Sequence, residues 1–315
     1  MFTLPLNDTQ AITIDDADED TWQVHHVDFA ARSITRVAVD GIGRVTAAHY
    51  DAGRKLLWLI VGGRLFAMKD DEVFDVPMPD DEAFFAYTVV GDGPAVYVAG
   101  EYSNLWRVAL PSMDWEPVLK PPPPPEDVDD EALQSAQTKD YARRHPPLYA
   151  GFKHGDDFMF AGALGTVVRL RNGVVEQRTL PSGHRFVSGR AEGGRVSLSA
   201  DSQGGSIVVG DFDGAFEVLF QDSQPALHRT ALHAGRRYIG VAEYPPSSLH
   251  NLYTHDGTGL SRVTTGCARE PGPLISLQAT EHALFAVDAG GVFRLSNGAW
   301  TLVDEADLER ETWPA

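Results

Sequence analysis

Histidine, cysteine and acidic side chains are the groups in this chain that could do chemistry, and their spacing matches no catalytic motif. His25 and His26 are adjacent in a predicted strand, so their side chains point to opposite faces and do not readily ligate one metal. Cys267, the only cysteine, follows Gly266 and has no histidine nearby. The sequence also lacks a G-x-S-x-G elbow, an H-E-x-x-H site and a P-loop. We expect no catalytic residue, no metal ligand and no cofactor; whether the protein is an enzyme stays open, with a non-enzyme favoured.

Acidic residues gather in runs that could attract a basic partner. The net charge is −19, and residues 1–131 hold 25 Asp or Glu against 9 Lys or Arg. Such runs are either solvated loops that keep the protein soluble or an acidic face for a basic protein. The second interpretation predicts these binding residues: Asp70, Asp71, Glu72, Asp80, Asp81, Glu82, Glu126, Asp127, Asp129, Asp130 and Glu131. Direct nucleic-acid binding is not expected, because it needs clustered Lys and Arg.

The composition also bears on the compartment. A single cysteine allows no internal disulfide, which is typical of a reducing compartment. The first residues show no basic region followed by a long apolar run, and no stretch is long enough to span a membrane. We expect a cytoplasmic monomer with no signal peptide and no membrane association.

Short strands and tight turns recur along the chain and would position these side chains. Val292 and Phe293 precede the hairpin signal Asn297-Gly298, and a looser copy lies at residues 165–175. The predicted third strands align at 66–68, 106–108, 168–170, 216–218, 261–263 and 293–295. From Phe66 to Phe293 five steps cover 227 residues, about 45 per step. The fourth unit is predicted at 196–199, 207–209, 215–219 and 226–230, and the fifth at 238–242, 249–253 and 260–263, with a poor last strand around Leu274.

A repeat of this length with four short strands is typical of a β-propeller. A single four-stranded blade leaves both of its apolar faces exposed to water, and the packing of blades into a closed ring buries these faces. We therefore predict an all-β, single-domain propeller over residues 1–315. Seven blades are favoured, with residues 11–44 as the seventh; six blades plus a closing N-terminal strand, or a pair of β-sandwiches, are the alternatives.

The units at 165–175 and 290–300 resemble the β-propeller superfamily. The resemblance is generic, because the marks of WD40, kelch and sialidase repeats are absent. It implies a fold with ligands bound on a rim or in a central channel, and no particular activity. Metal-dependent lactonases of this class use acidic residues from several blades, and the resemblance points to Glu101, Asp211, Asp213 and Asp288 as the candidates here.

Residues 120–147 interrupt the repeat. Pro121 to Pro125 predict a polyproline II rod. Residues 128–144 then predict a helix, with acids at its start and Arg143, Arg144 and His145 at its end. Tyr141 in this helix is a candidate contact residue. The segment is predicted to be an excursion between blades that either contacts a partner or covers a blade edge.

These observations favour a non-enzymatic propeller that binds a protein with a basic surface. A concrete version is a bacterial immunity-type protein that blocks a basic toxin or enzyme. The alternatives are a lactonase-like hydrolase with a metal in the channel, and a scaffold subunit of a larger assembly.

Overall fold

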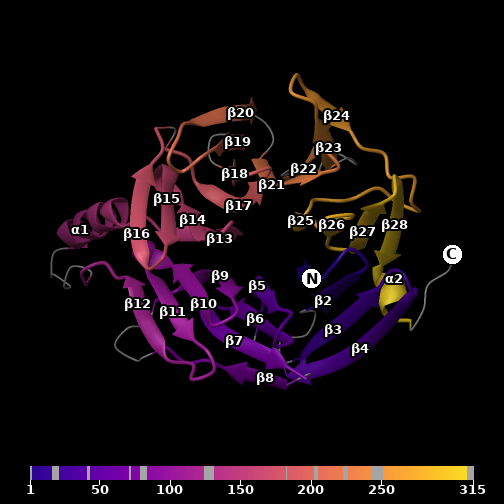
Figure 1. Ribbon diagram of the computed structural model, residues 1–315, viewed down its shortest axis with the longest axis horizontal. Coiled ribbons are helices and arrows are strands. Elements are labelled where there is room, and N and C mark those ends of the chain that lie inside the picture. Colours follow the sequence, from indigo (N-terminus) through magenta and orange to yellow (C-terminus); the bar gives the residue numbers. More distant parts are fainter. Residues whose placement is uncertain are drawn as a thin grey trace.

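Seven four-stranded antiparallel sheets form a ring in the computed structural model (Figure 1). The structure describes residues 2–15, 21–40, 43–70, 72–78, 84–123, 131–181, 183–201, 205–222, 226–242 and 251–310. In every sheet the strands follow chain order, with the first nearest the centre of the ring and the fourth at its outer edge. This arrangement confirms the β-propeller fold and the seven-blade prediction.

The first four blades account for residues 2–179. Their strands are β1 Phe2–Pro5, β2 Gln10–Asp15, β3 Thr21–Asp28, β4 Ser33–Asp40, β5 Val45–Asp51, β6 Leu56–Val61, β7 Arg64–Lys69, β8 Glu72–Asp75, β9 Ala86–Asp92, β10 Ala95–Gly100, β11 Leu105–Ala109, β12 Trp115–Leu119, β13 Leu148–His154, β14 Asp157–Gly162, β15 Thr166–Arg171 and β16 Val174–Thr179. Two 3₁₀ turns, η2 Glu101–Ser103 and η3 Ala163–Gly165, separate the second and third strands of blades 3 and 4.

The last three blades account for residues 186–304. Their strands are β17 Phe186–Glu192, β18 Arg195–Ala200, β19 Gly205–Gly210, β20 Phe216–Asp222, β21 Ala226–His233, β22 Arg236–Ala242, β23 Leu252–His255, β24 Leu260–Arg262, β25 Ser276–Ala279, β26 Leu284–Asp288, β27 Gly291–Ser296 and β28 Ala299–Asp304. A short helix, α2 Glu305–Leu308, follows the last strand.

The strand assignment of blades 5 and 6 corrects the predicted units. The first strand of blade 5, β17, is not predicted from the sequence, so each later strand is assigned one position too early in its blade. The segments 216–218 and 261–263, aligned as third strands, therefore belong to or adjoin the fourth strands β20 and β24. Leu274 is a buried core residue outside any strand. The reason is composition, since β17 reads FVSGRAE and lacks the apolar run that marks a buried strand.

Packing of neighbouring blades buries the second strands on both faces. Every residue of the second strands β6 and β14 is buried, as is every residue of β19, the third strand of blade 5. Outer strands such as β16 face solvent on one side and alternate between exposed and half-buried side chains. A strand covered on both faces favours apolar side chains at every position, which is why Leu56–Val61 is an unbroken apolar run.

The ring closes between blade 7 and blade 1 without a shared strand, because β1–β4 and β25–β28 are separate sheets. The first blade thus begins at Phe2, nine residues before the predicted start, and the closing-strand alternative is wrong.

Asp8 joins the two blades by accepting hydrogen bonds from Thr280 Oγ1 (2.5 Å) and the backbone N–H of His282 (2.9 Å). These two hydrogen bonds hold the pKa of Asp8 below its usual value. An apolar cluster that contains Phe29 and Phe285 fills the space between the blades.

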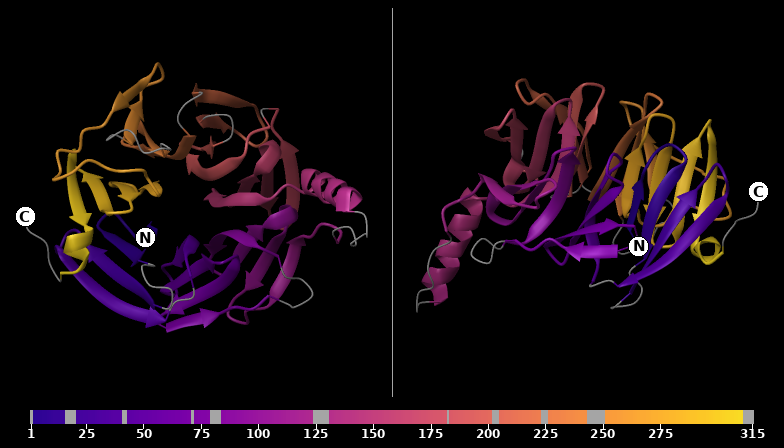
Figure 2. Two further views of the ribbon diagram at one scale, coloured as in Figure 1. Left: turned by 180° about the vertical axis from the view of Figure 1, so that it is seen from behind. Right: turned by 60° about the horizontal axis from the view of Figure 1, so that its bottom comes forward.

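Helix α1, Glu131–Arg144, lies between β12 and β13 and projects from the outer side of the ring (Figure 2). It matches the predicted helix at its C-terminal end. Within its described side chains only Tyr141 is buried, so the helix is otherwise polar and solvent-facing. No helix in the described ranges is long and apolar enough to cross a membrane.

Gly162 gives a direct test of the turn that follows β14. A Cβ at this position would lie 1.8 Å from the carbonyl oxygen of Pro147, and the N–H of Ala163 donates to that oxygen at 3.0 Å. We expect Gly162→Ala to lower the free energy of unfolding by about 2–3 kcal/mol, because the inner and second strands must separate there. Urea unfolding measures this, with Gly173→Ala as a comparison at an open turn of positive φ where no atom lies within 4 Å of the added Cβ. Equal losses in the two variants would show that backbone conformation, and not the contact with Pro147, makes glycine necessary.

Candidate functional site

Few of the predicted acidic binding residues lie in the part of the chain that the structure describes. Asp70 is exposed in the turn between β7 and β8, and Glu72 is exposed at the start of β8. Glu131 begins helix α1, but its side chain is outside the described residues. Also outside them are Asp71, Asp80, Asp81, Glu82, Glu126, Asp127, Asp129 and Asp130. Their binding role stays a prediction.

Tyr141 anchors helix α1 to the ring and has only 4% of its surface exposed. Its hydroxyl donates to the carbonyl oxygen of Pro122 at 2.5 Å, and its ring packs edge-on against Tyr102 with centroids 5.0 Å apart. Burial raises the pKa of Tyr141. The side chain can therefore orient the helix and the proline segment, but it offers little surface to a partner.

The four acids considered for a channel metal site have separate structural surroundings. Asp288 is buried and accepts two hydrogen bonds from Arg269, while Asp213 pairs with Arg169 at 2.6 Å on the outer part of the ring. Glu101 lies in turn η2 of blade 3, and Asp211 follows β19 in blade 5. In the described parts of the chain, no three His, Cys, Asp or Glu side chains gather as metal ligands.

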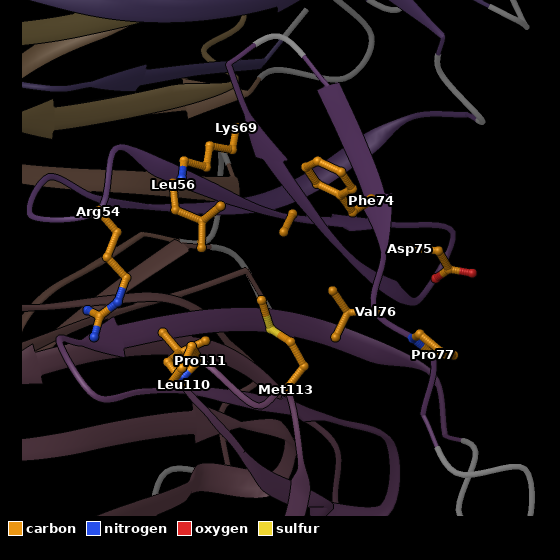
Figure 3. A pocket seen from close by; sticks show the side chains of 11 residues that line it. Arg54, Leu56, Lys69, Phe74, Asp75, Val76, Pro77, Leu110, Pro111 and Met113 are labelled. Carbon is orange, nitrogen blue, oxygen red and sulfur yellow. The ribbon is translucent and has the colours of Figure 1, made fainter.

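An apolar groove lies between blades 2 and 3 and has a volume of about 740 Å³. Figure 3 shows its lining, with the Met113 side chain reaching toward the space between Leu56 and Val76. Phe74 lies at the opposite wall, and Arg54 and Lys69 lie toward one end. The lining residues are Arg54, Leu56, Ala67, Lys69, Phe74, Asp75, Val76, Pro77, Leu110, Pro111 and Met113. We call this site the interblade groove.

The interblade groove is the open end of the apolar layer between blades 2 and 3. Leu56, Ala67 and Val76 belong to that core layer, and Leu110 packs against it. Beyond them the layer is not covered, and Phe74 is 46% exposed and Met113 37% exposed. Large apolar side chains that line a concave surface are typical of a binding site.

Met113 holds a backbone conformation that is unusual for its residue type. Its φ is 63°, in the left-handed region, and its N–H donates to the carbonyl oxygen of Ala109 at 2.8 Å. A side chain other than glycine costs roughly 1–2 kcal/mol in this conformation. Strain of this kind is concentrated at functional sites, and here it presents an apolar side chain at the mouth of the groove.

Charged residues of both signs surround the groove. Arg54 pairs with Asp51 at 2.9 Å, and Arg64 pairs with Asp75. Burial raises the pKa of Asp51, but hydrogen bonds from Arg54 outweigh it and hold this pKa below its usual value. The other exposed charges among the described residues 52–72 include Lys55, Lys69, Asp70 and Glu72, and the acidic residues 80–82 follow in sequence. Phe74 to Pro77 therefore lie between two acidic runs.

The sequence analysis does not identify the interblade groove, because residues 72–75 carry no binding motif and form the short outer strand β8. One signal in the sequence could have indicated the groove. Phe74, Val76 and Pro77 are apolar and stand between acidic runs, whereas a turn that faces solvent is usually polar. The contribution of Leu110 and Met113 from the next blade could not be predicted without the packing of the blades.

Comparisons with known proteins agree with this architecture. No protein-family profile matches the chain, and no curated protein matches it significantly. Among solved structures, the propeller domain of Cps50 (Swd1) from Myceliophteria thermophila aligns with a TM-score of 0.59 at 13% identity, over 92% of this chain and 95% of that one. YCF48 bound to D1 peptide aligns at 0.58 with 7% identity, over 90% and 91%.

The chain has the fold of the β-propeller superfamily. A third propeller, the WD40 domain of Doa1, aligns at 0.58 with 10% identity, over 95% of this chain and 90% of that one. At such low identities the likeness of this propeller to the others concerns the fold alone.

Proposed function

We propose that this β-propeller is a non-enzymatic protein-binding module whose interblade groove takes an apolar segment with basic flanks from a partner protein. The observation that carries the proposal is the open apolar layer at Phe74 and Met113, beside exposed Asp70 and Glu72. Apolar side chains in the groove would supply affinity, and the acidic edge would select Lys or Arg beside them.

The magnitudes suit an interaction of this kind. Burying one Leu- or Phe-sized side chain contributes about 1.5–3 kcal/mol. Exposed ion pairs contribute roughly 0–1 kcal/mol each, so the acids would act mainly on the rate of association. A solved propeller of similar shape is recorded with a bound peptide, which supports a peptide segment as the occupant.

The immunity-type inhibitor is the more specific form of this proposal. A toxin or enzyme with a basic surface would then be blocked by insertion of one of its apolar loops into the interblade groove. The acidic excess of residues 1–131 is the observation that favours such a partner.

Selection from a displayed library of random peptides tests the proposal without knowledge of the partner. The bait is the full chain, and the counter-bait carries Phe74→Asp and Met113→Asp. We expect peptides enriched on the bait to carry a large apolar residue flanked by Lys or Arg. Their affinity should fall about tenfold or more on the counter-bait, because both substitutions place charge in an apolar groove.

A matched control uses two exposed apolar residues on other blades. Val174, 59% exposed on β16, and Val218, 48% exposed on β20, are replaced by aspartate in one variant. This variant should bind the selected peptides as the unmodified chain does. Peptides that bind all three proteins equally, or that carry acidic flanks, would contradict the proposal.

The acidic edge makes a separate kinetic prediction. Association of a selected peptide should slow as salt rises, since the Debye length shrinks to about 8 Å at physiological ionic strength. Neutralising Asp70, Asp71, Glu72, Asp80, Asp81 and Glu82 to Asn or Gln should lower the association rate more than it raises the dissociation rate. Surface plasmon resonance measures both rates. An association rate that does not change with salt would contradict a binding role for these acidic residues and would mean that they serve only to keep the protein soluble.

A further inference from the structure

The innermost strands of blades 2 to 6 share one irregularity near their first residues. In each of them the pairing with the second strand of the blade shifts by one residue, and a bulge of this kind re-aims the side chain of the extra residue. The strands β9 and β13 of blades 3 and 4 are neighbours in the ring (Figure 1). Their extra residues are Tyr87 and Tyr149, so the two blades place a tyrosine at the same point of adjacent strands.

Phe85 extends these two tyrosines into a row of three rings. The ring centroids of Phe85 and Tyr87 lie 5.3 Å apart, and those of Tyr87 and Tyr149 lie 5.0 Å apart. Phe85 is 44% exposed, and both tyrosines are half-buried. We call these three residues the aromatic row. Exposed aromatic surface of this extent is typical of a binding site.

The backbone holds the exposed ring of Phe85 in place. The carbonyl oxygen of Phe85 accepts from the N–H of Glu101 at 2.9 Å, and the N–H of Ala86 donates to the carbonyl oxygen of Gly63 at 2.9 Å. A Cβ at Gly63 would lie 2.5 Å from the Phe85 ring, so the ring rests directly on this turn of blade 2. Phe85 is therefore a fixed part of the surface.

One carboxylate lies beside the aromatic row. Glu101 begins turn η2, and its Oε2 accepts from the N–H of Phe85 at 3.4 Å. Burial raises the pKa of Tyr87, and the charge of Glu101 raises it further, which shows that this carboxylate is near the tyrosine hydroxyl. Glu101 takes part in no ion pair with the residues that the structure describes. Its negative charge is thus left uncompensated next to Phe85 and Tyr87.

Arg185 acts on the other end of the row. Its charge lowers the pKa of Tyr149 against the larger, raising effect of burial. Arg185 Nε donates to Asp201 at 2.7 Å, so a carboxylate of blade 5 holds this arginine at the Tyr149 end. A cation from outside the chain would find its place at the Phe85 end, where two rings meet Glu101.

We propose that the aromatic row and Glu101 bind a lysine or arginine side chain of a partner protein. The apolar stem of that side chain would lie across Phe85 and Tyr87, and its ammonium or guanidinium group would face Glu101. Aromatic faces attract cations, and long basic side chains cover apolar surface with their stems. Residues 1–131 hold 25 Asp or Glu against 9 Lys or Arg, which favours a basic partner at this half of the ring.

The site lies at the opposite end of blade 3 from the interblade groove. Phe85 directly precedes β9, whereas the groove residue Leu110 donates its N–H to the carbonyl oxygen of Pro94, just beyond the end of β9. The seven residues of β9 separate the two places by about 20 Å. The aromatic row and Glu101 share no residue with the groove, so this proposal does not rest on the function proposed for it.

Nuclear magnetic resonance titration of the full chain, with ¹³C in its aromatic rings, tests the proposal at constant ionic strength. The probes are three blocked tripeptides with a central lysine, arginine or norleucine between glycines. We expect the lysine or the arginine peptide to shift the ring signals of Phe85 and Tyr87 in a saturable way. The norleucine peptide has the lysine stem without the charge and should bind about threefold more weakly or worse. The tighter of the two basic peptides identifies the preferred cation.

Variants separate a ring that binds from a ring that only packs. Phe85→Leu and Tyr87→Leu should each weaken binding of the basic peptide about threefold or more, while Tyr87→Phe, which keeps the ring, should bind as the unmodified chain does. Glu101→Gln should weaken binding to a similar extent. Glu281→Gln is the matched control, because it removes the same charge from an exposed side chain of blade 7 and should leave binding unchanged.

Three results would overturn the proposal. One is equal binding of the norleucine peptide and the basic peptides by the unmodified chain, which needs no variant to be folded. Another is an equal loss of affinity in Glu101→Gln and Glu281→Gln, which would assign the attraction to net charge alone. The third is unchanged ring signals of Phe85 and Tyr87 at saturation. None of these results depends on whether the interblade groove binds a peptide.

Discussion

Replacing Phe285 with alanine is expected to lower the free energy of unfolding by about 4 kcal/mol, the largest effect of any single truncation considered for this chain. Phe285 is fully buried in β26, and its ring meets that of Phe29 edge-on with centroids 5.8 Å apart. The contact joins blade 7 to blade 1, where the two sheets share no strand. The cavity left by the ring would therefore weaken the apolar packing that closes the circle between the two ends of the chain.

Urea unfolding and amide hydrogen exchange together measure this effect. Phe160→Ala is the matched control, since Phe160 is also fully buried but lies in the apolar cluster between blades 3 and 4. Both variants should lose similar stability, and only Phe285→Ala should speed exchange in β1–β4 and β25–β28 ahead of the other blades. The same exchange pattern in both variants would show that closure is no weaker than any other interface of the ring.

Asp288→Ala is expected to cost about 3 kcal/mol, because it removes a buried carboxylate on which Arg269 and two backbone N–H groups depend for hydrogen bonds. Asp288 is 2% exposed and accepts hydrogen bonds from Arg269 Nη1 and Nη2 at 2.5 and 2.8 Å. It also accepts from the backbone N–H groups of Gly272 (2.7 Å) and Gly290 (2.9 Å). One carboxylate thus fixes the segment before β25 and the turn after β26.

Thermal and urea unfolding measure the loss, with Asp92→Ala as the control. Asp92 pairs with Lys153 at 2.6 Å, but both side chains are well exposed, so its removal should cost less than about 1 kcal/mol. A small effect of Asp288→Ala would mean that this carboxylate does not hold the fold together and would reopen the question of its role as a ligand.

The blade repeat could be predicted because it rests on local signals. The unbroken apolar run Leu56–Val61 and the Asn297-Gly298 turn correspond to a fully buried strand and to a turn in which both residues have positive φ. The strand β17 could not be predicted in the same way. Its residues Ser188, Gly189 and Arg190 line the channel, and a strand that faces a polar cavity has no apolar pattern.

The difference between local and long-range signals also explains why some features of the candidate site could be predicted from the sequence and others could not. Acidic runs are visible in the sequence, and Asp70 and Glu72 are indeed exposed beside the interblade groove. The groove itself arises where turns of two blades meet, which joins Phe74 to Met113 across 39 positions of the chain. Near the centre of the ring, Arg190 of blade 5 and Arg229 of blade 6 donate hydrogen bonds to carbonyl groups of residues 275 and 277, just before and in the first strand of blade 7. Contacts between blades depend on how the ring closes, and no local pattern carries that information.

Amide hydrogen exchange on the chain with and without a selected peptide tests the binding role of the interblade groove most directly. We expect slower exchange in the peptide complex in residues 72–78 of blade 2 and 109–114 of blade 3, where the backbone supports Phe74 and Met113. The protection should disappear in the variant with Phe74→Asp and Met113→Asp. Protection confined to helix α1 or to the innermost strands of the ring, with these two segments unchanged, would contradict the account.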